Sequence, residues 1–153
     1  MIVRVATESD ISQLGQLYTN SVRYLAPQYY SPAQVQAWAS FPSERESFAK
    51  FILEPTTFIL QEAETIFGFS GIADDGHITA VYVHHNYLRQ KIGSRLLATV
   101  LESAQVNKIP RLYAEASEFS QPLFAKFGFE TYAQEQVERN NVCFERYLVQ
   151  KFN

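Results

Sequence analysis

The sequence predicts an α/β (α+β) fold with a single mixed sheet flanked by helices. Apolar residues recur at helical spacing in some segments and alternate in β-rich runs in others, and the two kinds of segment are interleaved along the chain. The 153 residues are 46% hydrophobic and 19% charged, which fits one domain with its own core, spanning residues 1–153.

The N-terminal third is predicted to form one short strand and three helices. Residues 2–5 are a β-branched run typical of a strand, and Glu8-Ser9-Asp10 offers N-caps for a helix that Pro27 ends. Ser31-Pro32 begins a second helix, with serine as the cap and proline in the first turn. A third helix is expected from about residue 43 to residue 53.

The middle of the chain changes to strand spacing and then returns to helix. Asp74-Asp75-Gly76 is a strong turn signal, and residues 62–64 fit a hairpin turn. A long amphipathic helix is expected over residues 91–106. Strands are expected at residues 57–60, 65–72 and 77–83.

The C-terminal third is predicted to form one strand, a short helix and then two final strands. Pro110 ends the long helix, and Gly128 closes a short helix over residues 119–127. Asn140-Asn141 fits a turn between the last two strands. Strands are expected at residues 111–116, 129–136 and 142–149.

Charge and cysteine content narrow the partners and the compartment. The net charge of −3 argues against nucleic acid as a partner, and no apolar run is long enough for a membrane helix. Cys143 is the only cysteine, which rules out an intrachain disulfide and a cysteine-rich zinc site. The first residues lack the features of a signal peptide. We therefore expect a cytoplasmic protein without membrane or nucleic-acid partners.

Residues 77–97 carry the strongest chemical signal, because a strand enters a tight loop that opens a long helix. The first turn of a helix presents unpaired N–H groups and partial positive charge, which suits a phosphate. Gly93 allows close approach of the backbone, and Arg89 and Lys91 could add charge. The alternative is an ordinary helix start with solvated basic residues.

Two motifs resemble those of the GNAT superfamily of N-acetyltransferases. The run from Gly76 to Leu97 resembles the acetyl-CoA-binding motif, and Pro122–Phe129 resembles the pattern Pro-Phe-Tyr-Glu-Lys-x-Gly-Phe. The resemblance implies a mostly antiparallel GNAT-like fold and acetyl-CoA as cosubstrate, without a metal. The cofactor-binding residues that it implies are Val81, Tyr82, Val83, Leu88, Arg89, Gln90, Lys91, Ile92, Gly93, Ser94, Ser117 and Phe124.

The chain departs from the family pattern at four positions. Leu88 replaces the Arg or Gln that opens the loop, and Lys91 replaces the first glycine of a Gly-x-Gly pair. Ser117 replaces an Asn that often contacts the pantetheine arm, and Phe124 replaces the tyrosine that often protonates the departing thiolate. Another group or water then supplies that proton, or the thiolate leaves unassisted.

The expected catalytic residues are Glu115, Tyr82 and Ser117. The resemblance places the oxyanion donor among the backbone N–H groups of the Tyr82–Val83 region and splays residues 77–83 from residues 111–116. Alternation along the second strand puts Glu115 beside that splay as a candidate base. The alternative is an ion-paired or solvated glutamate at the end of a strand.

The acceptor pocket is expected to include aromatic residues of the first helices and polar residues of the strand at 77–83. An aromatic wall could hold an amine by cation–π contact, although core packing of the helical layer is the favoured interpretation of Trp38. The adjacent His84 and His85 lack a third ligand at suitable spacing, so no metal is expected. The candidate acceptor residues are Tyr24, Tyr29, Tyr30, Trp38, His77 and Thr79.

Together these expectations describe an N-acetyltransferase that moves an acetyl group from acetyl-CoA to a primary amine of a small molecule or protein. The amine would attack directly in a ternary complex. The alternative is an acyl-CoA-binding sensor or interaction module with weak or no transferase activity. The final strands could also pair with a second copy to form a homodimer.

Overall fold

Every segment that the sequence predicts as helix or strand forms one in the computed structural model, which describes all of residues 1–153. The strands are β1 (Ile2–Val5), β2 (Thr56–Glu62), β3 (Thr65–Ile72), β4 (Ile78–Val83), β5 (Arg111–Ala116), β6 (Glu130–Arg139) and β7 (Val142–Phe152). The helices are α1 (Ile11–Leu25), α2 (Pro32–Ala39), α3 (Arg45–Leu53), α4 (Ile92–Val106) and α5 (Gln121–Lys126). Short 3-10 turns lie at Glu8–Asp10, Ala26–Gln28, Phe41–Ser43 and His85–Tyr87.

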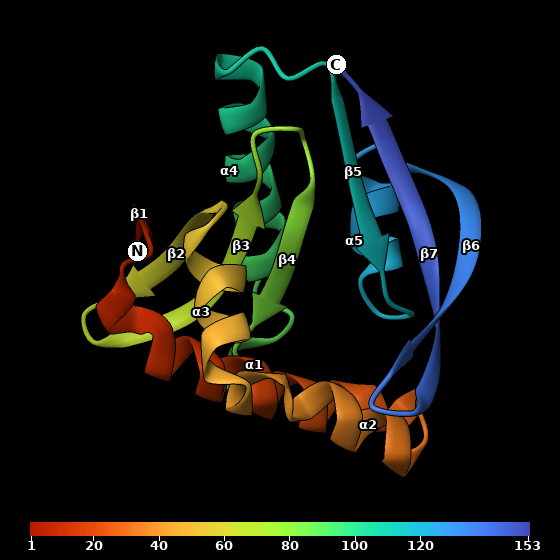
Figure 1. Ribbon diagram of the computed structural model, residues 1–153. Coiled ribbons are helices and arrows are strands. Elements are labelled where there is room, and N and C mark those ends of the chain that lie inside the picture. Colours follow the sequence, from red (N-terminus) through yellow and green to blue (C-terminus); the bar gives the residue numbers. More distant parts are fainter.

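The strands form two antiparallel ladders, in the order β1-β2-β3-β4 and β5-β7-β6. They meet at a single parallel bridge between His77 and Tyr113, where the Tyr113 N–H donates to Gly76 O at 3.1 Å. Beyond that bridge β4 and β5 diverge (Figure 1). The predicted fold class is confirmed, but the expected single sheet is continuous only at this bridge. The splay falls between the two strands that the family resemblance indicated.

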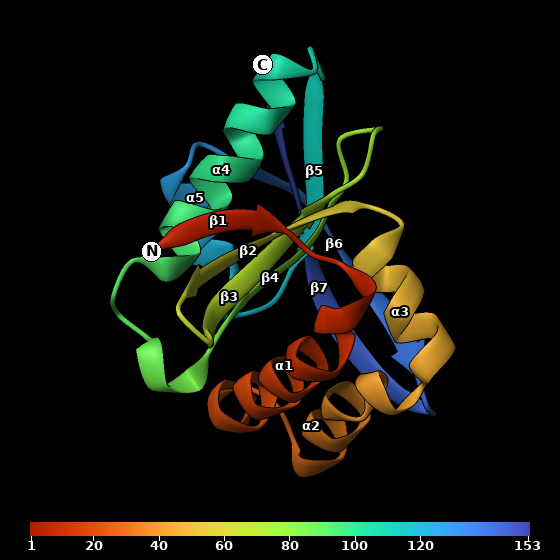
Figure 2. The same ribbon diagram turned by 90° about the vertical axis from the view of Figure 1, so that its left-hand side faces the viewer.

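Helices cover both faces of the strands. The first three helices lie on one side, and α4 and α5 lie on the other (Figure 2). Leu14 and Val22 of α1 pack with Phe48 of α3 and Phe69 of β3 in one apolar cluster. A second cluster joins Leu97 and other apolar residues of α4 to β5, α5 and β7. Burial of these two faces fixes the strand ends between them, where the candidate site lies.

An ion pair fixes the start of α1 to β1. Arg4 donates to the two carboxylate oxygens of Asp10 at 2.8 and 2.7 Å, and the Thr7 N–H donates to the same carboxylate at 2.8 Å. The Arg4 hydrogen bonds are the main reason that the pKa of Asp10 falls to about 2. Asp10 is buried, so its charge is held in the orientation that anchors the helix.

The β6–β7 hairpin is longer than the sequence predicted. Its strands continue to Arg139 and to Phe152, beyond the expected ends at residues 136 and 149. The hairpin reaches α2 (Figure 1), where Gln34 Nε2 donates to Cys143 O at 2.9 Å. Cross-strand pairing continues through polar residues, which alternation of apolar residues cannot reveal. No helix has both the length and the apolar character needed to cross a membrane.

Candidate active site

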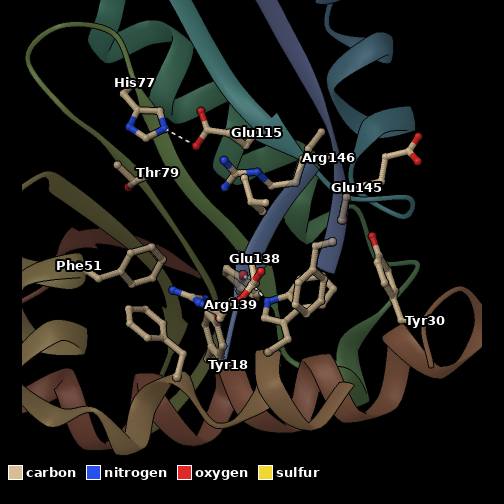
Figure 3. Close-up of a pocket in the computed structure, with 17 residues that line it drawn as sticks. Tyr18, Tyr30, Phe51, His77, Thr79, Glu115, Glu138, Arg139, Glu145 and Arg146 are labelled. Carbon is tan, nitrogen blue, oxygen red and sulfur yellow. Dashed lines mark hydrogen bonds and ion pairs between the residues drawn. The ribbon is translucent and has the colours of Figure 1, made fainter. Parts of the chain in front are cut away.

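Two cavities meet beside the open ends of β4 and β5. One is a narrow slot of about 70 Å³ between the strands, and the other is an open cleft of about 470 Å³ (Figure 3). The cleft lies between the strand ends, the first helices and the β6–β7 hairpin. Residues that line both cavities mark their junction: Trp38, Thr79, Tyr82, Glu115 and Ser117.

The slot is walled by two open backbone edges. The His84 N–H donates to Phe67 O at 2.7 Å, and polar groups of successive strand residues alternate in direction, so the N–H groups of Val81 and Val83 face away from β3; Val81 lines the slot. On β5 the Tyr113 N–H faces β4, which places the backbone of Glu115 on the same edge. An extended ligand with amide groups can therefore pair with either strand.

This register narrows the expected position of the oxyanion donor. The sequence placed it in the Tyr82–Val83 region without choosing between the two N–H groups. Tyr82 is paired with Phe69, and its N–H faces β3, so of the two N–H groups that of Val83 is the one on the open edge of β4. Tyr82 contributes its side chain to the cleft instead.

The loop before α4 is a cradle of unpaired amides. The backbone N–H groups of residues 88–94 donate no hydrogen bond to a backbone carbonyl. The first backbone hydrogen bond of the helix is donated by the Arg95 N–H to Lys91 O at 3.0 Å. Lys91 is the N-cap and has a left-handed backbone, with φ of +61°. Glycine adopts this conformation without strain, which explains why glycine is common there in the family.

Side chains close this cradle from the neighbouring helix. A Cβ at Gly93 would lie 3.2 Å from Leu123 Cδ2 of α5, so the missing side chain permits close approach. Lys126, also on α5, extends its Nζ to Ser94 Oγ at 3.3 Å. No local sequence pattern links Lys126 to the loop, because Lys126 and Ser94 are 32 positions apart. The helix start and this additional cation together suit a phosphate-bearing ligand.

Glu115 faces a histidine across the splay. His77 Nε2 lies 2.8 Å from Glu115 Oε1, and the His77 ring stacks on Tyr113 with centroids 4.8 Å apart. The Tyr113 hydroxyl donates to Asp75 at 2.5 Å, and this hydrogen bond is the main cause that raises the pKa of Tyr113 to about 12. Glu115 is therefore both paired, as the alternative interpretation holds, and present at the junction of the cavities.

The remaining family-derived positions lie beside the slot. The Ser117 N–H donates to Ser120 Oγ at 2.8 Å, and the Ser120 N–H donates to Ser117 Oγ at 3.1 Å, so these serines shape the turn before α5. Phe124 is buried, with an edge-on contact to Phe129 at 5.1 Å between centroids, and it lines the slot. A phenyl ring at this position cannot supply a proton to a leaving group.

The floor of the cleft is aromatic. Tyr18 and Tyr82 have ring centroids 4.4 Å apart, and Trp38 Nε1 donates to the Tyr82 hydroxyl at 3.2 Å. Tyr30 makes an edge-on contact with Trp38 at 5.3 Å. Burial raises the pKa of both Tyr18 and Tyr82, so their hydroxyls stay neutral at physiological pH. Trp38 also stacks on Phe119, so its ring both packs against a neighbouring aromatic side chain and lines the cleft.

The expected acceptor residues divide into two groups. Four line the cleft: Tyr30, Trp38, His77 and Thr79. The expectation for Tyr24 and Tyr29 was wrong, because they are 60% and 56% exposed and lie outside the cleft. Tyr24 lies near the end of α1, and Tyr29 follows the short turn at Ala26–Gln28, which carries both to the outer surface. Proximity to Pro27 in the sequence therefore does not predict which of these tyrosines line the cleft and which are exposed to solvent.

Sequence reasoning missed one complete wall of the cleft. Arg139 and Arg146 enter from the β6–β7 hairpin, with Glu138 near Arg139 in the view of Figure 3. No local motif identifies such residues, because the hairpin reaches the first helices from about a hundred positions away in sequence. The missed lining residues are Tyr18, Phe41, Phe51, Ala116, Val137, Glu138, Arg139, Phe144, Glu145 and Arg146.

The adjacent histidines belong to the loop before α4. His84 Nδ1 accepts from the Asn86 N–H at 3.1 Å, and the His84 and His85 rings stack with centroids 4.8 Å apart. Burial lowers the pKa of His84. The structure gathers no group of three His, Cys, Asp or Glu side chains that could hold a metal ion.

The unpaired amides at the start of α4 suit a phosphate group, and the slot between the splayed strands suits an extended arm that pairs with a strand edge. The model of the acetyltransferase (GNAT) domain matches residues 26–150. The chain therefore belongs to the GNAT acetyltransferase family and is an acetyl-CoA-dependent N-acetyltransferase.

Individual relatives agree with this assignment. The chain is 28% identical over 149 residues to the uncharacterized N-acetyltransferase YafP of Escherichia coli (strain K12), covering 96% of this chain and 93% of that protein. The GCN5-related N-acetyltransferase of Rhodopseudomonas palustris has a TM-score of 0.95 at 24% identity, covering 99% and 95% of the two chains. The PaiA N-acetyltransferase of Thermoplasma acidophilum, solved with coenzyme A, has a TM-score of 0.77 at 17% identity, with both chains fully covered. The two structural likenesses establish the fold.

Proposed function

We propose that this enzyme transfers the acetyl group of acetyl-CoA to a primary amine of a small molecule or protein, by direct attack in a ternary complex. The observation that carries the proposal is the junction of the slot and the cleft at Glu115. A thioester in the slot and an amine in the cleft would meet there, with a carboxylate beside both.

The slot and the loop fit the two parts of acetyl-CoA. The amide cradle at residues 88–94 would bind the pyrophosphate, with Lys126 adding positive charge. The pantetheine arm would pair with the open edge of β4, which directs the thioester toward the junction. The Val83 N–H would then donate to the oxygen that becomes negative in the tetrahedral intermediate.

The proton of the amine has a nearby acceptor. An alkylammonium ion has no lone pair, so it must lose a proton before it attacks the thioester carbonyl. Glu115 would accept this proton directly or through water, while His77 holds the carboxylate at the junction by the 2.8 Å contact. Tyr113 in turn stacks against His77, which restricts the imidazole to this orientation.

Direct attack is favoured over an acetylated cysteine intermediate. Cys143 is the only thiol, and it is exposed on the β6–β7 hairpin outside both cavities. Phe124 cannot protonate the departing sulfur, so the CoA thiolate leaves as an anion and takes a proton from water afterwards. A thiolate is a stable enough leaving group for this, because the pKa of a thiol is moderate, at about 8.5.

The test is an initial-rate study with acetyl-CoA and a panel of primary amines, in which free CoA thiol is measured. Direct attack predicts intersecting double-reciprocal lines and no CoA release without an amine. Parallel lines would contradict the ternary complex. Binding of CoA without turnover by any amine would instead favour the acyl-CoA sensor, which the changes at Phe124, Ser117 and Lys91 keep as a second candidate. A single-domain organisation, a homodimer and a cytoplasmic location stay predictions.

A further inference from the structure

The cleft contains an arginine that has no acidic partner. Arg146 is ion-paired with Glu135, and Arg4 is ion-paired with Asp10. Arg139 makes no ion pair, although Glu138 and Glu145 line the same cleft. An arginine that is exposed at a cleft and unpaired is available to an anionic ligand.

Contacts with aromatic rings hold this guanidinium over the floor of the cleft. Its Cζ lies 4.7 Å from the centroid of Phe41, within the range of a cation–π contact. Figure 3 shows Arg139 next to Tyr18, on the side of the cleft that the first helices form. The positive charge of Arg139 also opposes the rise in pKa that burial imposes on Tyr18 and Tyr82. The charge therefore acts inside the cleft.

The cleft is consequently polarised. Glu115 lies at the junction with the slot, with His77 beside it toward the strands, and Arg139 lies near the helices (Figure 3). Aromatic side chains occupy the floor between them, among them Tyr82 and Trp38. A ligand that fills this space needs an amine at one end, an apolar body and a negative group at the other.

We propose that Arg139 binds a carboxylate of the acceptor, so that the substrate is a small amine with a carboxylate on an apolar or aromatic body. This inference rests on the proposed function, because it assigns the acceptor of the same reaction. Arg139 would act as a specificity-determining residue and would take no part in the chemical step. A polyamine would place a second cation beside Arg139, and the like charges would oppose its binding.

The cleft volume favours a small molecule over a protein. About 470 Å³ lies at the lower end of the range of small-molecule sites and would hold an aromatic amino acid or a similar amine. The β6–β7 hairpin contacts α2 across one side of the cleft, which restricts the space for a polypeptide chain. Efficient acetylation of protein N-termini, with weak acetylation of small carboxylated amines, would overturn the inference.

The experiment compares matched amines in the wild type and in three Arg139 variants. The amines are para-(aminomethyl)benzoate, benzylamine and para-xylylenediamine, together with phenylalanine and phenylethylamine. We expect the wild type to prefer each carboxylated amine to its neutral partner by about tenfold or more in kcat/KM. Arg139→Gln should remove that preference, Arg139→Glu should shift it toward the diamine, and Arg139→Lys should retain part of it. Arg23→Gln, on the exposed surface of α1, is the matched control and should change nothing.

A second measurement separates this inference from the proposed function. Calorimetry on the CoA-loaded protein gives the affinity for each amine without turnover, and circular dichroism confirms that each variant is folded. Equal wild-type affinity and kcat/KM for carboxylated and neutral amines would overturn the inference while leaving the acetyltransferase activity standing. Tighter binding of the carboxylated amine that Arg139→Gln abolishes, with no acetyl transfer, would support the anion contact and contradict the proposed function.

Discussion

The two sides of the active site are built from different parts of the polypeptide. The proposed acetyl-CoA side consists mainly of backbone groups, from the edge of β4 and the amides of residues 88–94. The acceptor side consists mainly of side chains, which come from α1, α2, α3 and the β6–β7 hairpin. One side is continuous in sequence, whereas the other is assembled from segments up to about a hundred residues apart.

This difference explains where the chain can depart from its family. Lys91 replaces a glycine in the loop, yet the loop keeps its row of unpaired amides because φ at Lys91 still takes the left-handed value. A backbone site therefore tolerates a change of side chain if the conformation survives. The acceptor cleft has no such tolerance, because replacing Arg139 or Glu115 changes the chemistry that the cleft presents.

The largest effect is expected from Gly93→Glu, which breaks the acetyl-CoA side alone. The new Cβ would lie 3.2 Å from Leu123, and the carboxylate would add negative charge where the phosphates bind. We expect CoA affinity to fall by about a hundredfold or more, as measured by calorimetry, because like charges at a binding interface cost several kcal/mol. Gly93→Ala should lose less than about tenfold, since only the steric change remains.

The control for Gly93→Glu is Ala98→Glu, which places the same charge on an exposed position of the same helix. It should leave CoA affinity unchanged. A folded Gly93→Glu variant with wild-type affinity would show that the phosphates do not bind at the start of α4.

The next largest effect is expected from substitution of Glu115, which lies at the junction of the slot and the cleft. Glu115→Gln removes the proton acceptor but keeps the size of the side chain, so we expect kcat to fall by about a hundredfold with little change in CoA affinity. The low-pH limb of the rate profile should change as well. His77→Gln should reduce kcat less, because His77 positions Glu115 through the 2.8 Å contact.

Glu118→Gln is the matched control. Glu118 lies two residues after the end of β5, and its carboxylate accepts a hydrogen bond from the Tyr147 hydroxyl outside the cleft. Wild-type kcat and an unshifted pH profile for Glu115→Gln would make Glu115 a structural residue. The same steady-state assay with acetyl-CoA and the best amine would measure all three variants.

The difference between the two sides of the site also explains how much of the structure could be predicted from the sequence. The pattern of apolar residues located every strand and helix, because it reflects burial of one face. It failed at the ends of β6 and β7, where polar residues such as Gln150 continue the ladder through cross-strand hydrogen bonds. It also could not show that the sheet is divided, since one bridge at His77 decides the spacing of β4 and β5.

The sequence predicts candidate site residues only where they are local. Residues 77–97 form the expected continuous strand, loop and helix, so their motif could be interpreted as a CoA-binding side, which stays a prediction. Glu115 followed from alternation on β5, but its contact with His77 spans 38 positions. Arg139 and Phe144 reach the cleft through the tertiary position of the hairpin, and single-sequence patterns carry no information on that position.

A smaller effect is expected at the anchor of α1, which supports the acceptor side through Tyr18. The folded state lowers the pKa of Asp10 from 3.8 to about 2, so the charged form is preferred on folding. This contribution is fully present above about pH 4 and is lost as the pH falls toward 2. Asp10→Asn should therefore reduce the free energy of unfolding by about 2 kcal/mol at pH 7.

Urea unfolding at several pH values would measure this loss. The stabilities of Asp10→Asn and the wild type should converge below about pH 2, because the wild-type carboxylate becomes protonated in that range. CoA affinity at pH 7 should stay within about twofold, since the amide cradle lies on α4 across the strands. A stability difference that did not depend on pH would show that the charge of Asp10 is not what anchors the helix.

The smallest effect is expected from Lys91→Gly, which tests whether the cradle is truly a backbone site. Relief of the left-handed conformation at Lys91 is worth about 1 kcal/mol, and the greater freedom of glycine in the unfolded chain offsets part of it. We expect a net gain of about 0.5 kcal/mol in urea unfolding. CoA affinity should change by less than about threefold, because the amides at residues 88–94 keep their directions.

Lys91→Ala removes the same charge but keeps the strained backbone, so it should not gain stability. If both variants lost CoA affinity by tenfold or more at low salt, the Lys91 ammonium would be a direct phosphate contact, and the distinction between a backbone-built side and a side-chain-built side would fail at this residue.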